Sequence, residues 1–143
     1  MADILIVDDD PSILSTLREI LEVNGYSVES AVDGTGAIAM VKAAPYRIAL
    51  LDIKLPDMEG TELLAGVRKI RPGIKCIMVT GFASLENAIK SLNAGASAYV
   101  MKPVNPKNLL DTINEKIAEQ DAEEEITGEK VSDWAADQLL RIS

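Results

Sequence analysis

The chain has 143 residues, a length that fits one domain, and 48% of them are apolar, which is enough for a substantial core. Its net charge of −9 and pI near 4.5 argue against binding of nucleic acid or an anionic membrane by this chain itself. It contains no histidine, which excludes Ser-His-Asp and Cys-His catalysis, histidine metal ligands and a phosphohistidine relay within the chain.

The sequence also indicates where the protein works. Its one cysteine, Cys76, lies in an apolar run, so we expect a buried thiol in a reducing compartment. The N-terminus leads directly into a predicted strand without a signal peptide, and no apolar run reaches the length of a membrane span. We therefore expect a soluble, cytoplasmic protein that does not interact with a membrane.

Strand and helix patterns alternate along most of the chain. Short apolar or alternating runs predict strands at residues 3–7, 26–31, 48–51, 74–79 and 98–101. Helical periodicity predicts a helix after each strand, beginning near Asp10-Pro11, near Asp33-Gly34, after Gly60, at Ser84 and at Pro106. Short crossovers between such elements require a parallel sheet with helices on both faces, which is a doubly wound α/β fold.

The last residues have a different character. We expect a domain over residues 1–120, followed at residues 121–143 by an acidic segment, interrupted at Gly128, and an amphipathic helix that Ser132 caps. One interpretation is an exposed linker or a helix extension. The alternative is a coupling helix that packs Trp134 on a partner chain or on a downstream domain, in which case the chain is a piece of a longer protein.

Polar residues follow the predicted strands: Asp8 and Asp9, Asp52, Thr80 and Lys102. Because parallel strands end at one edge of a sheet, and open α/β sheets bind ligands there, we expect these five side chains to share one cleft. An Asp after a strand is most often a helix cap, but Asp10 already fills that role and leaves Asp8 and Asp9 unexplained.

Electrostatics indicate what such a cleft would bind. Two carboxylates about 4 Å apart repel by roughly 4 kcal/mol at an effective dielectric near 20. They either raise their pKa values or recruit a cation, and oxygen ligands open to water suit Mg²⁺. A Mg²⁺ ion beside Asp52 would allow this carboxylate to accept a phosphoryl group as a nucleophile, with Lys102 and Thr80 contacting phosphoryl oxygens.

Four segments resemble the motifs of bacterial two-component response-regulator receiver domains: ILIVDDD at residues 4–10, LLDIKLPDMEG at 50–60, VTG at 79–81 and YVMKP at 99–103. The resemblance covers residues 3 to about 119, with the motifs in order. It implies a five-stranded sheet in the order 2-1-3-4-5 with five helices. It also implies a non-enzymatic signalling switch, phosphorylated on Asp52 by the phosphohistidine of a sensor histidine kinase or phosphotransfer protein.

The resemblance also implies a role for each site residue. Asp9, Asp52 and the backbone carbonyl of Lys54 would ligate Mg²⁺, with Asp8 acting largely through a water. Thr80 and Tyr99 would form a switch pair that changes the surface of the fourth helix, fifth strand and fifth helix. That surface would control a partner or output domain, or a phosphorylation-dependent homodimer. The Lys102–Pro103 bond would be cis.

Two local features depart from the common pattern or modify it. Lys54 and Phe82 occupy positions that in this family border the path of the hydrolytic water, so we hypothesise that they slow self-dephosphorylation. Ala98 stands where the winged-helix transcription-factor branch has an acidic residue, which puts that branch's dimer contacts in doubt.

Three rival functions share parts of this pattern. A dehalogenase-type phosphatase also uses a strand-end Asp, but it needs a second Asp where this chain has Lys54. A flavodoxin-like or nucleotide-binding protein would carry a Gly-rich phosphate loop after Val7, where three acids stand instead. A degenerate receiver that never takes phosphate would not be expected to keep the complete set of acids, Thr80 and Lys102.

Overall fold

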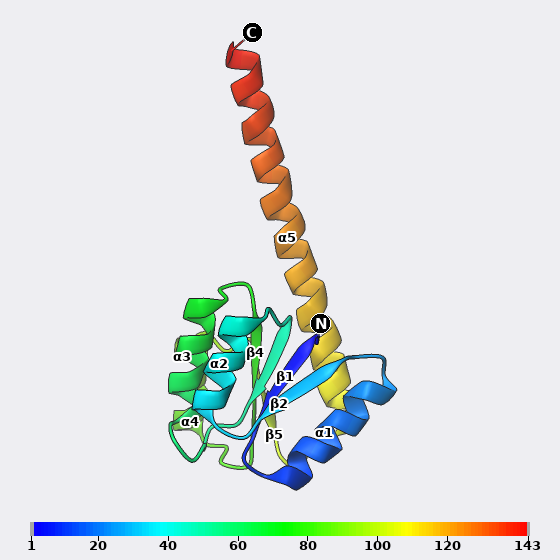
Figure 1. The fold of residues 1–143 in the computed structure, drawn as a ribbon, viewed down its shortest axis with the longest axis vertical. Coiled ribbons are helices and arrows are strands. Elements are labelled where there is room, and N and C mark those ends of the chain that lie inside the picture. The colour runs from blue at the N-terminus through cyan, green and yellow to red at the C-terminus, as the bar shows by residue number, and fades with distance from the viewer. Residues whose placement is uncertain (1, 143) are drawn as a thin grey trace.

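The chain folds around a five-stranded parallel sheet in the order β2-β1-β3-β4-β5 (Figure 1). This is seen in a computed structural model that describes residues 2–142, and the side chains of residues 2–125. The strands are β1 (Ile4–Val7), β2 (Val28–Ala31), β3 (Ile48–Leu51), β4 (Lys75–Thr80) and β5 (Ala98–Met101). The predicted fold class and strand order are confirmed, and the bounds of β3 and β5 are as predicted, whereas those of β1, β2 and β4 differ by one or two residues.

Five helices cover the two faces of the sheet: α1 (Pro11–Val23), α2 (Gly34–Ala43), α3 (Gly60–Ile70), α4 (Leu85–Asn93) and α5 (Pro106–Ile142). Helices α1 and α5 lie on one face, and α2, α3 and α4 lie on the other (Figure 1). Side chains alternate between these faces along each strand, so Leu5 joins the α2–α3 core while Ile4 and Ile6 join the α1–α5 core. Both faces are dry, which explains why β1 and β3 are apolar at every position.

The capping residues predicted from the sequence begin three of the helices. The side chain of Asp10 accepts a hydrogen bond from the Ser12 N–H, and that of Asp33 accepts one from the Gly36 N–H. Ser84 caps α4 in the same way, at 3.0 Å from the Asn87 nitrogen. These bonds satisfy N–H groups that have no partner within the helix.

Helix α4 presents its apolar side chains to solvent. The sequence places Leu85, Ile89 and Leu92 at helical spacing, and in the structure these side chains are 78%, 49% and 62% exposed. The side facing the protein carries the fully buried Ser91, whose hydroxyl donates to the Asn87 carbonyl. An apolar stripe in a helix therefore does not always mark its buried face, and here it leaves an unpartnered surface beside β5.

Helix α5 continues past the sheet as a rod (Figure 1). It begins at Pro106, four residues after Lys102, and runs without interruption to Ile142, through Gly128. Its 37 residues span about 55 Å at 1.5 Å per residue. The helix extension is thus observed, whereas the division at residue 120 stays a prediction, and the packing predicted for Trp134 falls on a side chain outside the described part of the chain.

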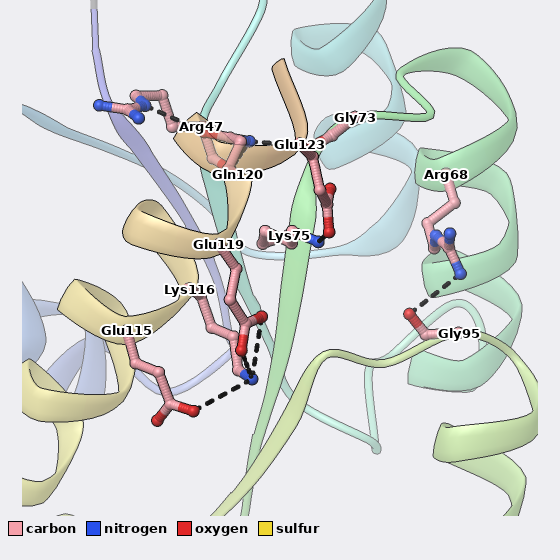
Figure 2. A network of polar contacts seen from close by, with 10 residues as sticks. All are labelled: Arg47, Arg68, Gly73, Lys75, Gly95, Glu115, Lys116, Glu119, Gln120 and Glu123. Atoms are coloured by element: carbon pink, nitrogen blue, oxygen red, sulfur yellow. Dashed lines mark hydrogen bonds and ion pairs between the residues drawn. The ribbon is translucent and has the colours of Figure 1, made fainter. Parts of the chain in front are cut away.

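A polar network anchors α5 to the amino-terminal edge of the sheet (Figure 2). The buried side chain of Gln120 donates to the carbonyls of Arg47 and Gly73, which precede β3 and β4. Arg47 pairs in turn with Asp121, and Lys75 pairs with Glu123 at 2.7 Å. The first acidic residues of the predicted linker therefore lie against the sheet edge.

Over residues 2–142, no helix combines the length and apolar character that a membrane crossing requires.

Candidate functional site

The carboxyl-terminal edge of the sheet brings together the acidic residues that follow β1 and β3. Asp8 and Asp52 are 3% and 4% exposed, because each leaves a strand that is covered on both faces. Asp9 is exposed beside them. One carboxylate oxygen from each of these three residues lies within 4.8 Å of the others. The convergence predicted from the strand ends is observed for this trio.

Lys102 reaches the same cluster from β5, although β4 separates β5 from β3 in the sheet. Its Nζ lies 2.6 Å from Asp8 Oδ2 and 3.1 Å from Asp52 Oδ2. The Lys102–Pro103 peptide bond is cis, as predicted. One ammonium group therefore faces two buried carboxylates, so the cluster retains negative charge even before Asp9 is counted.

The pKa values of Asp8 and Lys102 are both shifted, through burial and through the hydrogen bonds within the cluster. Burial raises the pKa of Asp8 above its ordinary value, and the hydrogen bonds from Lys102 and from the Asp10 N–H only partly oppose this. Burial alone would lower the pKa of Lys102, but its hydrogen bonds to Asp8 and Asp52 raise it, so that the ammonium stays charged. Desolvated carboxylates in this arrangement favour a further cation.

The donor atoms fit a hard divalent cation. Asp8, Asp9 and Asp52 offer carboxylate oxygens, and Asp9 lies open to water. The second oxygens of the two buried carboxylates are fixed by the backbone: Asp8 Oδ1 accepts from the Asp10 N–H at 2.9 Å, and Asp52 Oδ1 accepts from the Ile53 N–H at 2.7 Å. Oxygen ligands with access to water are the set that Mg²⁺ prefers.

Thr80 is the last residue of β4. The strand therefore ends one residue later than predicted, because Thr80 still pairs with Met101 in the parallel register. Its side chain is fully buried, and its hydroxyl oxygen accepts a hydrogen bond from the Phe82 N–H at 3.0 Å. Thr80 thus stands at the same sheet edge as the carboxylates, with its hydroxyl tied to the loop that leads into α4.

Tyr99 lies on the edge strand β5, and its ring packs partly against the α2–α3 core. Its hydroxyl is buried, and it completes no hydrogen bond with any of the described residues. Burial raises the pKa of Tyr99, and the nearby Ser84 backbone opposes this only in part. The Tyr99 side chain is therefore held mainly by packing, with the Ser84 backbone as a nearby polar group.

Lys54 lies in the loop after β3 and Phe82 in the loop after β4, and their side chains contact each other. Lys54 Nζ lies 5.0 Å from the centre of the Phe82 ring, within cation–π range. Phe82 is 53% exposed, so this contact lies at the protein surface.

The loop from Ile53 to Glu59 is fixed at both ends. At its base, the Gly60 N–H donates to the Ile53 carbonyl, and a Cβ at Gly60 would lie 2.0 Å from the Asp52 carbonyl oxygen. At its tip, Asp57 accepts hydrogen bonds from the start of α2. The sequence alone does not indicate this role of Asp57, since its partners lie more than 20 residues earlier and no local spacing connects them.

The chain is similar to a known protein family and to several curated proteins. A family model described as the response regulator receiver domain matches residues 4–114. The chain is 34% identical over 116 residues to the transcriptional regulatory protein ZraR of Salmonella typhimurium, and the match covers 81% of this chain but 26% of that protein. The chain thus spans about a quarter of the length of the curated relatives it matches.

Two solved structures share the fold. A CheY-like response regulator receiver domain protein from Methanospirillum hungatei JF-1 is 58% identical with a TM-score of 0.82, and the match covers 84% of this chain and 96% of that one. A response regulator protein from Burkholderia pseudomallei is 28% identical with a TM-score of 0.76, and the match covers 89% and 75% of the two chains. The latter structure contains a phosphorylated aspartic acid and a calcium ion.

Proposed function

Because this chain belongs to the response regulator receiver domain family, we propose that Asp52 accepts a phosphoryl group from the phosphohistidine of a sensor histidine kinase or phosphotransfer protein. A receiver domain is a regulatory phosphoacceptor and not an enzyme that turns over an external substrate. The observation that carries the proposal is the burial of Asp52 in one acidic cluster with Asp8 and Asp9, at the edge that Lys102 also reaches.

Each site residue has a task in the transfer. A carboxylate oxygen of Asp52 forms a bond to phosphorus while the phosphorus–nitrogen bond of the phosphohistidine breaks, and the electron pair of that bond returns to the imidazole nitrogen. Asp9, Asp52 and the Lys54 carbonyl would hold Mg²⁺, with Asp8 acting largely through a water. The bound ion would neutralise negative charge on the transferring group.

Lys102 and Thr80 contact the product. The Lys102 ammonium already lies 3.1 Å from an Asp52 oxygen, so it can pair with a phosphoryl oxygen attached there. The Thr80 hydroxyl currently accepts a bond from Phe82 and has a proton free to donate to another phosphoryl oxygen. A shift of Thr80 toward the phosphoryl group would make room for Tyr99, whose unbonded hydroxyl leaves it able to respond.

The surface of α4, β5 and α5 is the proposed output. It presents the exposed apolar side chains of Leu85, Leu92 and Met101, which a partner or output domain can cover. Several curated relatives are transcriptional regulatory proteins longer than this chain, which supports such an output domain. A phosphorylation-dependent homodimer is a second form of output. With a net charge of −9, we propose no nucleic-acid contact within these residues, and a cytoplasmic location.

The test is incubation with Mg²⁺ and a small phosphodonor such as acetyl phosphate, followed by intact mass measurement. We expect one added phosphoryl group on the native chain, none without Mg²⁺, and none on Asp52→Asn. An unmodified native protein, or equal modification of Asp52→Asn, would contradict the proposal.

A further inference from the structure

Asp57 joins the loop after β3 to the beginning of α2. Its Oδ1 accepts a hydrogen bond from the Gly34 N–H at 2.9 Å. Its Oδ2 accepts from the Thr35 N–H at 2.9 Å and from the Thr35 hydroxyl at 2.6 Å. Three donors from the first turn of one helix therefore converge on a carboxylate that belongs to a different loop.

The negative charge of Asp57 complements the N-terminus of α2. The first turn of α2 contains no acidic residue of its own, and the positive end of the helix dipole faces Asp57. The hydrogen bonds from Thr35 and Gly34 lower the pKa of Asp57 to about 2 although the carboxyl is exposed. Asp57 is thus charged at any pH near neutrality, and its bonds to α2 are charge-assisted.

Packing reinforces the same junction. A Cβ at Gly34 would lie only 2.4 Å from Met58 Sδ, so the neighbouring side chain of the loop lies directly on the start of α2. The loop and the helix therefore fit together over both a polar and an apolar contact.

The junction completes a ring of connections among β1, β2, α2 and the loop after β3. In the sheet, β1 lies between β2 and β3, so a bond from the β3 loop to α2, which follows β2, spans the width of β1. On the other side of the ring, the Asp8 N–H donates to the Ala31 carbonyl at the end of β2. The elements that carry Asp8 and Asp52 are thereby connected twice, once through the sheet and once through Asp57.

Lys54 lies between the two fixed points of this loop, and its backbone carbonyl is the third proposed metal ligand, besides Asp9 and Asp52. Gly60 holds the base of the loop against Asp52, and Asp57 holds its tip. Lys54 lies between these points, in an isolated bridge with Glu59. The direction of the Lys54 carbonyl therefore depends on both anchors.

From this geometry we infer that Asp57 is a positioning residue for the metal site: by tying the β3 loop to α2, it holds the Lys54 carbonyl and Asp52 in the arrangement that binds Mg²⁺. The inference rests on the proposed function for the identity of the metal ligands. Asp57 does not itself touch the cluster, and its effect passes through the loop.

The chain offers a matched control in Asp33. This residue caps the same helix, accepting from the Gly36 N–H at 2.7 Å, but it belongs to the segment that leads into α2 and does not bond to the β3 loop. Asp33→Ala and Asp57→Ala both remove a carboxylate from the start of α2, and only Asp57→Ala releases the loop.

The experiment measures the Mg²⁺ dissociation constant of the full chain and of each variant by titration calorimetry, with urea unfolding to compare stabilities. We expect Asp57→Ala to raise the dissociation constant about 10-fold, as supporting residues around metal ligands commonly do, and Asp33→Ala to change it less than about twofold. Equal shifts in the two variants, or no shift in Asp57→Ala, would overturn the inference.

The milder pair Asp57→Asn and Asp33→Asn covers the case in which an alanine variant does not fold. Asn is a good cap at residue 33, whereas at residue 57 its amide can accept only one of the two backbone bonds. The Mg²⁺ dissociation constant of Asp57→Asn should again exceed that of Asp33→Asn, by a smaller factor than in the alanine pair. Because the readout is Mg²⁺ binding, failure of the native chain to take phosphate would contradict the proposed function without altering this comparison.

Discussion

Lys102 places a single ammonium group between two buried carboxylates, those of Asp8 and Asp52. Lys102→Met would leave both carboxylates without their cation. Removing one partner from a buried ion pair is strongly destabilising, and we expect a loss of about 3 kcal/mol in the free energy of unfolding without Mg²⁺. Saturating Mg²⁺ should restore most of it, because the ion supplies the missing positive charge.

Urea unfolding with and without Mg²⁺ measures this effect. The exposed Lys42→Met is the control, and its stability should stay within about 0.5 kcal/mol of the native value in both conditions. A Lys102→Met protein as stable as the native chain without Mg²⁺ would show that the ammonium does not balance the cluster.

The contact between Lys54 and Phe82 carries a separate prediction about phosphoryl lifetime. Their side chains form a cation–π pair, and the positions of both residues in this family border the path of the hydrolytic water. Lys54→Ala and Phe82→Ala should each shorten the half-life of phosphorylated Asp52 several-fold, measured by intact mass after removal of the phosphodonor. A half-life of only seconds in the native chain, unchanged in Lys54→Ala, would count against this role.

At the residue level, the sequence located the site through strand ends. Asp8, Asp52 and Lys102 each follow an apolar run, and parallel topology alone brings such positions to one edge. Asp57 could not be found in this way. Its role depends on how two distant segments pack, and its own surroundings in the sequence are those of an ordinary turn.

Among the elements, α5 depends on an anchor at the edge opposite to the site. Gln120→Leu would remove the donor that Gln120 supplies to the Gly73 carbonyl, and one of the two donors of the Arg47 carbonyl, which also accepts from the Lys75 N–H (Figure 2). A typical hydrogen bond contributes about 0.5–1.5 kcal/mol net, so we expect the lost bonds to lower the free energy of unfolding by about 1–2 kcal/mol.

The matched control for this change is Glu125→Leu, which adds the same side chain at an exposed position of the same helix. Its stability should differ from the native value by less than about 0.5 kcal/mol in urea unfolding. If the two variants are equally stable, the Gln120 network does not hold α5 to the sheet.

Local patterns predicted where helices begin, but not which way the apolar face of α4 points or how far α5 extends. The caps at Asp10, Asp33 and Ser84 were evident because capping is a local interaction. The outward apolar face of α4 was not evident, since helical spacing shows that a stripe exists and not which way it faces. The prediction of a separate helix capped by Ser132, after an acidic segment interrupted at Gly128, was wrong: a helical glycine costs only about 1 kcal/mol, and α5 continues through both residues.

At the scale of the whole molecule, stability should fall at alkaline pH because of Tyr46. Its buried hydroxyl bonds to Glu29, and burial together with that bond raises the pKa of Tyr46 to about 12. A pKa raised in the folded state stabilises the protein below pH 10, and this contribution is lost as the pH rises from 10 toward 12. The loss from this group is up to about 1 kcal/mol per pH unit.

Urea unfolding at pH 9 and pH 11 tests the prediction by comparing the native chain with Tyr46→Phe. The variant has no phenol to ionise, so its stability should decline less between the two pH values. An identical decline in both proteins would assign the alkaline loss to other groups.

The overall architecture was predictable because five strand patterns alternate with five helix patterns, which admits few topologies. The order of the strands was not contained in that alternation, and it came from the resemblance of four motifs to receiver domains. The anchorage of α5 at Gln120 follows from contacts between segments some 50 to 70 residues apart, which single-sequence patterns do not encode.

The central claim is that Asp52 itself carries the phosphoryl group. Borohydride reduction of the freshly phosphorylated chain, followed by peptide mass spectrometry, converts an aspartyl phosphate to homoserine and so marks its position. We predict homoserine at residue 52, dependent on both Mg²⁺ and the phosphodonor, with Asp8 and Asp9 unmodified in the same digest. Homoserine at Asp8 or Asp9, or an unreduced Asp52 in protein whose intact mass shows the adduct, would contradict the account.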